Sequence, residues 1–137
     1  MAFIPYFVLA MLKPIDSILI FESHPEKILK AGEVIFEAGD RGELMYGLIE
    51  GEVEMYLKGQ LLETLTTGDA FGVRALVHED HQRFCTAIAK TDVRLAMMEK
   101  EHFFFAVQQT PMFALELLRS YSERLRNMKT QLLQSLS

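Results

Sequence analysis

Residues 32–72 read GEVIFEAGDRGELMYGLIEGEVEMYLKGQLLETLTTGDAFG, and this segment decides the fold class. It holds all eight glycines of the chain, and glycines that recur every few residues separate short strands with tight turns. Residues 52–57 alternate polar and apolar side chains, as a half-buried strand does. The pattern predicts a mainly β fold, either a sandwich, a jelly roll or a barrel. The strands are expected at 34–36, 45–49, 53–57, 60–65, 84–89 and 93–98.

Helices are expected on both sides of this β segment. Three prolines in residues 1–31 forbid one long helix there, so short helices between them are expected. Residues 100–137 read as helix, with a Thr-Pro pair at 110–111 suited to a helix start and no later glycine or proline. The length fits a single domain with an N-terminal helical or irregular segment (1–31), a β-roll (32–99) and C-terminal helices (100–137).

The C-terminal helix carries an apolar stripe at nearly heptad spacing. The stripe predicts a seam shared with a second copy of the chain, and hence a homodimer. A helix of about 27 residues would be about 40 Å long, more than a small β domain needs to cover itself. The alternative is a helix that lies wholly on its own core. The expected interface residues are Leu118, Tyr121, Leu125, Met128, Leu132 and Leu136.

The composition is that of an ordinary globular protein, since 50% of the 137 residues are hydrophobic and 24% are charged. One cysteine excludes an internal disulfide, and a net charge of −5 argues against non-specific binding of nucleic acid by the whole domain. The apolar stretch at residues 2–12 has about half of the roughly 20 residues that span a membrane. It is expected to dock on the core, with a peripheral membrane contact as the alternative. We therefore expect a cytoplasmic protein that does not insert into a membrane.

Three glycine-containing motifs follow one another in a definite order. They are GEVIFEAGD at 32–40, GLIEGEV at 47–53 and GDAFG at 68–72, followed by Arg83 and AKTD at 89–92. In this order they resemble the cyclic nucleotide-binding domain family, over about residues 27–130. The resemblance implies an antiparallel β-roll of eight strands, a jelly roll of the cupin-like double-stranded β-helix type. It also implies short N-terminal helices and a long C-terminal helix, which in bacterial regulators of the family pairs with a second copy.

The third motif contains the candidate ligand site. Gly72 leaves room for a phosphate to approach exposed backbone N–H groups, and an arginine facing them would hold the anion. The resemblance places Arg83 at the family's phosphate-binding arginine, whereas Val73 stands where a glutamate holds the ribose hydroxyl. Phe84 replaces the small residue that follows the arginine, which narrows the pocket. The candidate ligand-binding residues are Phe71, Gly72, Val73, Arg74, Ala75, Arg83 and Phe84.

The missing glutamate argues against ordinary binding of a cyclic nucleotide. A lost charged hydrogen bond costs about 1.5–3 kcal/mol, which is roughly 10- to 100-fold in affinity. We therefore expect a non-enzymatic regulatory domain that is dimeric, has lost or altered its cyclic-nucleotide binding and acts through a protein partner. No cofactor is expected, and the candidate ligands are a cyclic nucleotide or another small anion. A genuine sensor of cyclic AMP or cyclic GMP is the first alternative.

A cupin-like metal-binding enzyme is the second alternative. No metal site is expected, because His78 and His81 fall in a loop rather than on facing strands. Cys85 is expected to be a buried thiol, and residues 103–105 a buried helix segment. No catalytic residues are expected, since no Ser-His-Asp or Cys-His arrangement stands out. No DNA-binding domain, and so no direct DNA binding, is expected, because no helix-turn-helix follows the long helix in the sequence.

Overall fold

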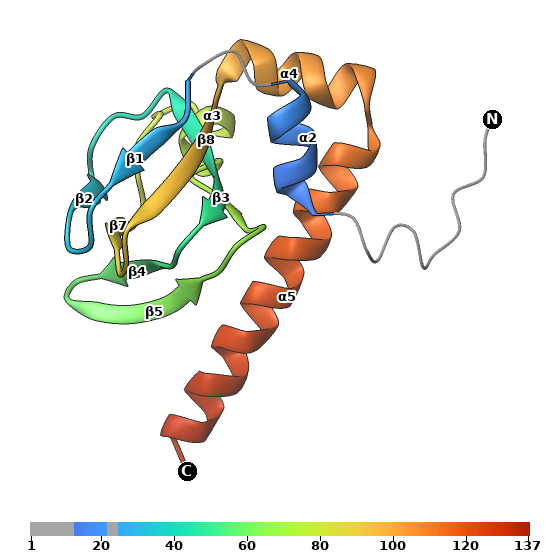
Figure 1. Cartoon of the computed structure of the whole chain (residues 1–137). Helices are drawn as coiled ribbons and strands as arrows, with labels where there is room; N and C mark the ends of the chain where they lie inside the picture. The colour runs from blue at the N-terminus through green and yellow to red at the C-terminus, as the bar shows by residue number, and fades with distance from the viewer. Residues whose placement is uncertain (1–12, 22–24) are drawn as a thin grey trace.

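The computed structural model describes residues 13–21 and 25–137, and its centre is a pair of four-stranded antiparallel sheets (Figure 1). One sheet has the strand order β1-β8-β3-β6 and the other β2-β7-β4-β5. The strands are β1 (Lys27–Leu29), β2 (Val34–Phe36), β3 (Leu44–Glu50), β4 (Val53–Leu57), β5 (Gln60–Leu65), β6 (Ala70–Phe71), β7 (Thr86–Ala89) and β8 (Val93–Glu99). The antiparallel β-roll predicted from the sequence is confirmed. The apolar stretch at residues 2–12 lies outside the described residues.

The strands agree with the sequence pattern except at its shortest elements. All six expected strands are present, with ends within two residues of those predicted. β1 and β6 were not expected, because segments of three and two residues are too short to show an alternation. They form by pairing with longer neighbours, β1 along β8 and β6 along β3.

The central strands β3 and β8 separate two apolar cores. Successive side chains of a strand point to opposite faces, so each strand serves both cores. Tyr46, Leu48 and Leu95 are buried in the core between the sheets. Met45, one position from Tyr46, and Met98, three positions from Leu95, are buried in a second core beneath the helices. The sheet that contains β3 and β8 is therefore covered on one face by the other sheet and on the opposite face by helices.

Helices α2 (Pro14–Phe21), α4 (Lys100–Gln109) and α5 (Met112–Ser135) meet over the second core (Figure 1). Phe103 of α4 is buried edge-on against Phe113 of α5, with ring centroids 5.8 Å apart. Phe104 and Phe105 are 44% and 49% exposed. The prediction of a buried 103–105 segment is therefore wrong for these two residues, since consecutive helical side chains point about 100° apart.

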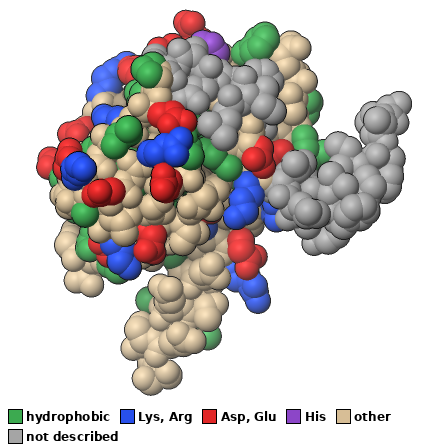
Figure 2. All heavy atoms as spheres, in the orientation of Figure 1, with side chains coloured by type: hydrophobic (Ala, Val, Ile, Leu, Met, Phe, Trp, Pro, Cys, Tyr) green, Lys and Arg blue, Asp and Glu red, His purple; other side chains and the backbone are tan. Residues whose placement is uncertain are grey.

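Helix α5 begins one residue later than predicted, with Pro111 at its N-cap and Thr110 closing α4. Its 24 residues correspond to about 36 Å, and its C-terminal half extends away from the roll (Figure 1). Charges of both signs are interspersed over the face drawn in Figure 2. Arg94 forms an ion pair with Glu26 at 2.8 Å. Within the described ranges, no helix has the length and apolar character needed to cross a membrane.

Candidate ligand-binding site

A pocket of about 470 Å³ lies between the end of β6, helix α3 (Arg74–Val77), the loop before β7 and one side of α5. Phe71 is outside it, fully buried between the sheets and stacked on Tyr46 with ring centroids 5.3 Å apart. Folding brings all the other predicted site residues together. Those that line the pocket are Gly72, Val73, Arg74, Ala75, Arg83 and Phe84.

Arg83 is held by the chain's own backbone, with only 6% of its surface exposed. Its Nη1 donates to the Gly72 carbonyl at 2.8 Å and its Nη2 to the Leu44 carbonyl at 2.6 Å. The guanidinium carbon lies 4.2 Å from the centre of the Phe36 ring. A Cβ at Gly42 or Gly72 would collide with the guanidinium, so the absence of a side chain at both positions makes this arrangement possible. Burial lowers the pKa of Arg83.

Arg74 fastens the loop between α3 and β7. It donates to both carboxylate oxygens of Asp80, at 3.0 and 3.1 Å, and to the Gln82 carbonyl at 2.7 Å. The Arg74 bonds, together with the backbone N–H of Gln82, lower the pKa of Asp80 to about 2. His81 Nδ1 lies 2.8 Å from the Ala75 carbonyl oxygen, a second tie between the loop and α3. The charge of Arg74 is thus matched inside the loop.

Sequence analysis missed a charged cluster that joins α5 to β5 at the edge of the pocket. Arg124 donates to the two carboxylate oxygens of Glu63 at 2.8 and 3.0 Å, and to the Ala70 carbonyl at 2.6 Å. The side chains of Arg124 and Glu63 are 12% and 17% exposed. Burial acts to lower the pKa of Arg124, but the bonds to Glu63 outweigh it and the pKa is raised. The partners are 61 residues apart, and no motif in one sequence signals such a pair.

Tyr121 connects α5 to the turn that was predicted to receive a phosphate. The backbone N–H of Val73 donates to its hydroxyl oxygen, and its ring lies 4.3 Å from the guanidinium carbon of Arg124. Burial raises the pKa of Tyr121. The sequence assigned Tyr121 to the seam between two copies, whereas in this chain its side chain lies against the pocket. One N–H of the expected anion-binding turn is therefore already occupied.

The other seam residues remain largely uncovered in the single chain. The first turns of α5 are docked, with Phe113 and Leu117 buried in the second core. The exposed fractions of the seam leucines show that the helix does not lie wholly on its own core. They are 65% for Leu118, 49% for Leu125, 61% for Leu132 and 76% for Leu136, while Met128 is partly buried.

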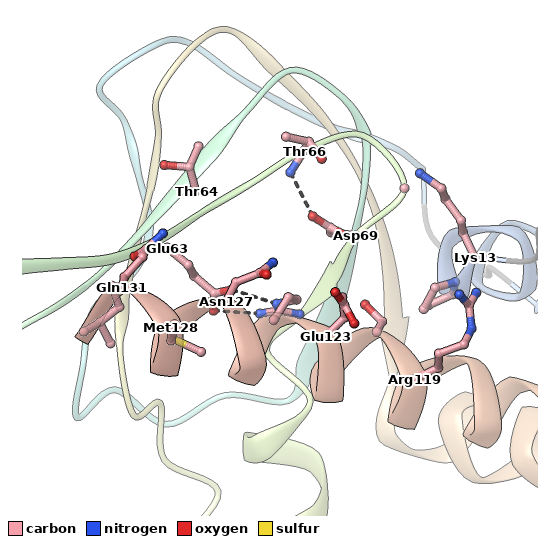
Figure 3. Close-up of a pocket in the computed structure, with 15 residues that line it drawn as sticks. Lys13, Glu63, Thr64, Thr66, Asp69, Arg119, Glu123, Asn127, Met128 and Gln131 are labelled. Atoms are coloured by element: carbon pink, nitrogen blue, oxygen red, sulfur yellow. Dashed lines mark hydrogen bonds and ion pairs between the residues drawn. The ribbon is translucent and has the colours of Figure 1, made fainter. Parts of the chain in front are cut away.

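A second cavity, a polar groove of about 380 Å³, runs along the same helix (Figure 3). Lys13, Asp69 and Glu123 bring charged groups to it. Glu63 and Arg124 line both this groove and the pocket, so their ion pair forms part of the wall that the two cavities share. The groove was not anticipated, because its residues come from three separate parts of the sequence.

The groups considered for metal binding do not converge. Within residues 13–21 and 25–137, no three His, Cys, Asp or Glu side chains are placed to hold a metal ion. Cys85 lines the pocket and is partly exposed, so the prediction of a buried thiol is wrong. Burial nevertheless raises the pKa of its thiol. The thiol is therefore neutral around pH 7.

Comparison with known families gives a match over most of the chain. The sequence model of the family described as "Cyclic nucleotide-binding domain" matches residues 26–110. A cAMP-dependent protein kinase regulatory subunit of Schizosaccharomyces pombe is 39% identical over 77 residues, which are 56% of this chain and 18% of that protein. The corresponding subunit of Emericella nidulans is 33% identical over 98 residues, or 70% of this chain and 24% of that protein. The chain thus spans a quarter or less of the length of these relatives.

Solved structures show the same architecture. The catabolite activator protein of Thermus thermophilus superposes with a TM-score of 0.69 at 28% identity, covering 89% of this chain and 59% of that one. A structure described under "A cyclic-GMP-dependent signalling pathway regulates bacterial phytopathogenesis" gives 0.68 at 26% identity, covering 82% of this chain and 91% of that one. The first comparison aligns 89% of this chain, so the alignment extends into the C-terminal helix.

Proposed function

We propose that this chain, which belongs to the cyclic nucleotide-binding domain family, is a non-enzymatic regulatory domain that acts through contact with another protein. In this proposal the pocket has lost or altered its cyclic-nucleotide binding, and α5 pairs with a second copy. The regulatory role is supported by the relatives, which are regulatory subunits of a protein kinase and a catabolite activator protein by name. The partner protein is inferred from the same names.

The observation that carries the proposal is that the chain itself occupies the groups that a cyclic phosphate would need. Arg83 donates to the carbonyl groups of Gly72 and Leu44, and the N–H of Val73 donates to the Tyr121 hydroxyl. Two of the five N–H donors of Arg83 are bound in this way. A phosphate that displaced one of these partners would leave a buried group unpaired, at a cost of about 1–3 kcal/mol. The Val73 side chain has no atom that can accept a hydrogen bond from a ribose hydroxyl.

Pairing through α5 is supported by the exposed leucines of the seam. Leu118, Leu125 and Leu132 are each about half to two-thirds exposed and follow one another along one side of the helix. A contiguous apolar surface of this kind on a protruding helix favours association, because its burial removes apolar area from water. Light scattering on the purified chain tests this part of the proposal, and a monomer at micromolar concentration would contradict it.

A genuine cyclic-nucleotide sensor is the second candidate. It is favoured by the position of Arg83, which lies in the pocket directly beside Gly72 as the family motif requires. For this function the guanidinium would have to exchange its carbonyl partners for a phosphate. A charged, bidentate bond to phosphate is stronger than a bond to a neutral carbonyl and would drive that exchange.

Titration calorimetry with cyclic AMP and cyclic GMP decides between the two candidates. We expect no binding at micromolar concentrations by the natural chain. Binding that is tight, and that disappears in Arg83→Ala, would establish the sensor and contradict the loss of the ligand. Arg83→Lys is the matched variant, since it keeps the charge without the planar fork of the guanidinium.

A further inference from the structure

Arg83 carries a buried positive charge that is not matched by a negative one. Only 6% of its surface is exposed, and burial lowers its pKa. Both of its hydrogen-bond partners are neutral carbonyl groups, and it forms no ion pair within the described part of the chain. The carboxylates of Asp40 and Glu43 attract it through space, but Asp40 is bonded to a backbone N–H and Glu43 to Arg41. An anion in the pocket would therefore meet an unmatched charge in apolar surroundings.

The guanidinium of Arg83 also keeps donors in reserve. It has five N–H groups, and only one on Nη1 and one on Nη2 are bonded to residues that the structure describes. Arg83 lines the pocket, so a ligand there can reach it. A carboxylate needs two N–H groups, because its two oxygens match the planar fork of a guanidinium. Such a bond would leave both carbonyl partners in place.

A cyclic nucleotide requires two further contacts that this pocket does not offer. Its ribose hydroxyl needs an acceptor, and the Val73 side chain has none. Its phosphate would draw on backbone N–H groups at the turn, where the Val73 N–H is already bonded to the Tyr121 hydroxyl. A carboxylate on an apolar body has no hydroxyl to satisfy and needs no backbone N–H. The pocket therefore favours a simpler anion than a nucleotide.

The roll, the loop before β7 and helix α3 give the pocket an apolar wall next to Arg83. This wall consists of Phe36, Met55, Ala75, Phe84 and Cys85. The Phe36 ring lies 4.2 Å from the guanidinium carbon, so the charge and the apolar surface adjoin each other. The opposite wall contains Leu118, Leu125 and Met128, which belong to the proposed seam. A second copy, and not the ligand, covers those three side chains.

We propose that this pocket binds a small organic carboxylate with a flat apolar body, whose carboxylate group is held by Arg83. The inference deepens the proposed function and rests on it, because it names the ligand class of a pocket with altered cyclic-nucleotide binding. Phe84 is 59% exposed and gives the flat body an aromatic surface. Burial of the body against the apolar wall adds to the charged bond at Arg83.

Two pairs of probes test the need for the negative charge. Benzoate and 2-naphthoate are carboxylates with flat bodies of two sizes, and benzamide and 2-naphthamide are their uncharged counterparts of nearly the same shape. Titration calorimetry on the full chain at pH 7, where the carboxylic acids are ionised, compares the members of each pair. We expect the tighter-binding carboxylate to bind at least tenfold more tightly than its amide. Equal binding of the two, or no binding of either carboxylate, would overturn the proposal.

Arg83→Met and Arg94→Met locate the carboxylate group. Both substitutions remove one guanidinium, but Arg94 lies on β8 and does not line the pocket. We expect Arg83→Met to abolish carboxylate binding and Arg94→Met to leave it unchanged. Urea unfolding checks that each variant is folded, and if Arg83→Met is not, Arg83→Lys replaces it. The lysine keeps the charge without the planar fork, so binding should weaken about tenfold. Unchanged binding in a folded Arg83 variant would overturn the proposal.

Phe84→Ser and Phe104→Ser locate the apolar body. Both rings are exposed, at 59% and 44%, so neither substitution empties the core. Phe84 lines the pocket, whereas Phe104 lies on α4 and is not part of the pocket wall. Phe84→Ser is expected to weaken carboxylate binding at least fivefold, and Phe104→Ser to leave it unchanged. Equal effects of the two variants would place the probe on other exposed apolar surface and overturn the proposal.

The outcomes also separate this inference from the proposed function. Cyclic AMP that binds at micromolar concentration and displaces the carboxylate would overturn both, because the pocket would then be a nucleotide site. A chain that binds neither cyclic AMP nor the carboxylates would overturn this inference alone. A chain that is monomeric in light scattering but binds the carboxylate through Arg83 would contradict the proposed pairing through α5 and support this inference.

Discussion

Two neighbouring groups of side chains on helix α5 differ in what they contact. Tyr121 and Arg124, here called the docked face, are bound to the Val73 N–H, the Ala70 carbonyl and Glu63 of the same chain. The leucine stripe, here called the available face, includes Leu125 and Leu132, which are about half or more exposed, and Leu125 borders the same pocket as Tyr121. Polar groups with fixed partners set the position of the helix, and the apolar stripe is left to bind something else.

The largest effect is expected from the available face. Leu125→Glu together with Leu132→Glu would place four charges in a symmetric seam and remove the burial of four leucines, each contributing about 1.5–3 kcal/mol. The dissociation constant of the dimer should rise more than 100-fold, measured by light scattering or sedimentation. Folding stability of the chain should change by less than about 0.5 kcal/mol, since both positions are exposed in the single chain.

Leu133→Glu is the control for this pair of substitutions. Leu133 is 70% exposed and lies on the same helix, but it is outside the seam. A dimer that dissociates equally with Leu133→Glu would show that the stripe is not the interface.

The second-largest effect is expected on folding stability, when the ion pair of the docked face is broken. Glu63→Ala leaves the guanidinium of Arg124 buried without its carboxylate, and breaking a buried pair in this way costs about 3 kcal/mol. Urea unfolding measures the loss. Replacing both partners, as Glu63→Leu with Arg124→Met, should recover most of it, because two apolar side chains leave no unpaired charge. A double variant as unstable as Glu63→Ala would mean that the Arg124 bond to the Ala70 carbonyl is the important one.

The same contrast separates what the sequence can predict from what it cannot. Glycine spacing in residues 32–72 and alternation at 52–57 predicted the β-roll, because turns and half-buried strands constrain local sequence. The leucine periodicity predicted the available face of α5 for the same reason. The docked face was missed, since Glu63 and Arg124 lie 61 residues apart and meet only after folding. Local patterns also placed Arg83 in the pocket but said nothing of its carbonyl partners.

A smaller effect is expected from restoring the ribose acceptor at the pocket. Val73→Glu would supply a carboxylate beside Gly72, and Phe84→Ser would open space next to Arg83. The gain is that of a charged hydrogen bond, about 1.5–3 kcal/mol, reduced by the cost of desolvating the carboxylate. Cyclic AMP binding should become measurable by calorimetry in the double variant.

Tyr121 provides the control for that gain. Tyr121→Phe releases the Val73 N–H without adding an acceptor for the ribose. It should therefore leave cyclic AMP binding undetectable when introduced alone. Cyclic AMP binding by Tyr121→Phe as strong as that of the double variant would show that the occupied N–H, and not the missing glutamate, is the main obstacle.

The smallest effect is expected at the loop between α3 and β7, where Arg74 bonds to Asp80. These bonds lower the pKa of Asp80 from its ordinary value to about 2. A carboxyl whose pKa is lowered by folding stabilises the fold above its unfolded pKa, near 3.9, and this contribution is lost as the pH falls through the folded value. The window therefore lies between about pH 4 and pH 2. Because both side chains are well exposed, the loop should loosen without unfolding the chain.

Carbon-detected NMR titration of the Asp80 carboxyl should give an apparent pKa near 2 in the natural chain. In Arg74→Gln the pKa of Asp80 should return toward its ordinary value of 3.8, because the hydrogen bonds from Arg74, the largest cause of the lowered pKa, are removed. Seam dimerisation and the Glu63–Arg124 pair should be unaffected in this variant at pH 7, since the hydrogen bonds of Arg74 go to Asp80 and Gln82 within the loop. An unshifted Asp80 in the natural chain would mean that Arg74 is free to face the pocket, and that one charge there remains unmatched for an anionic ligand.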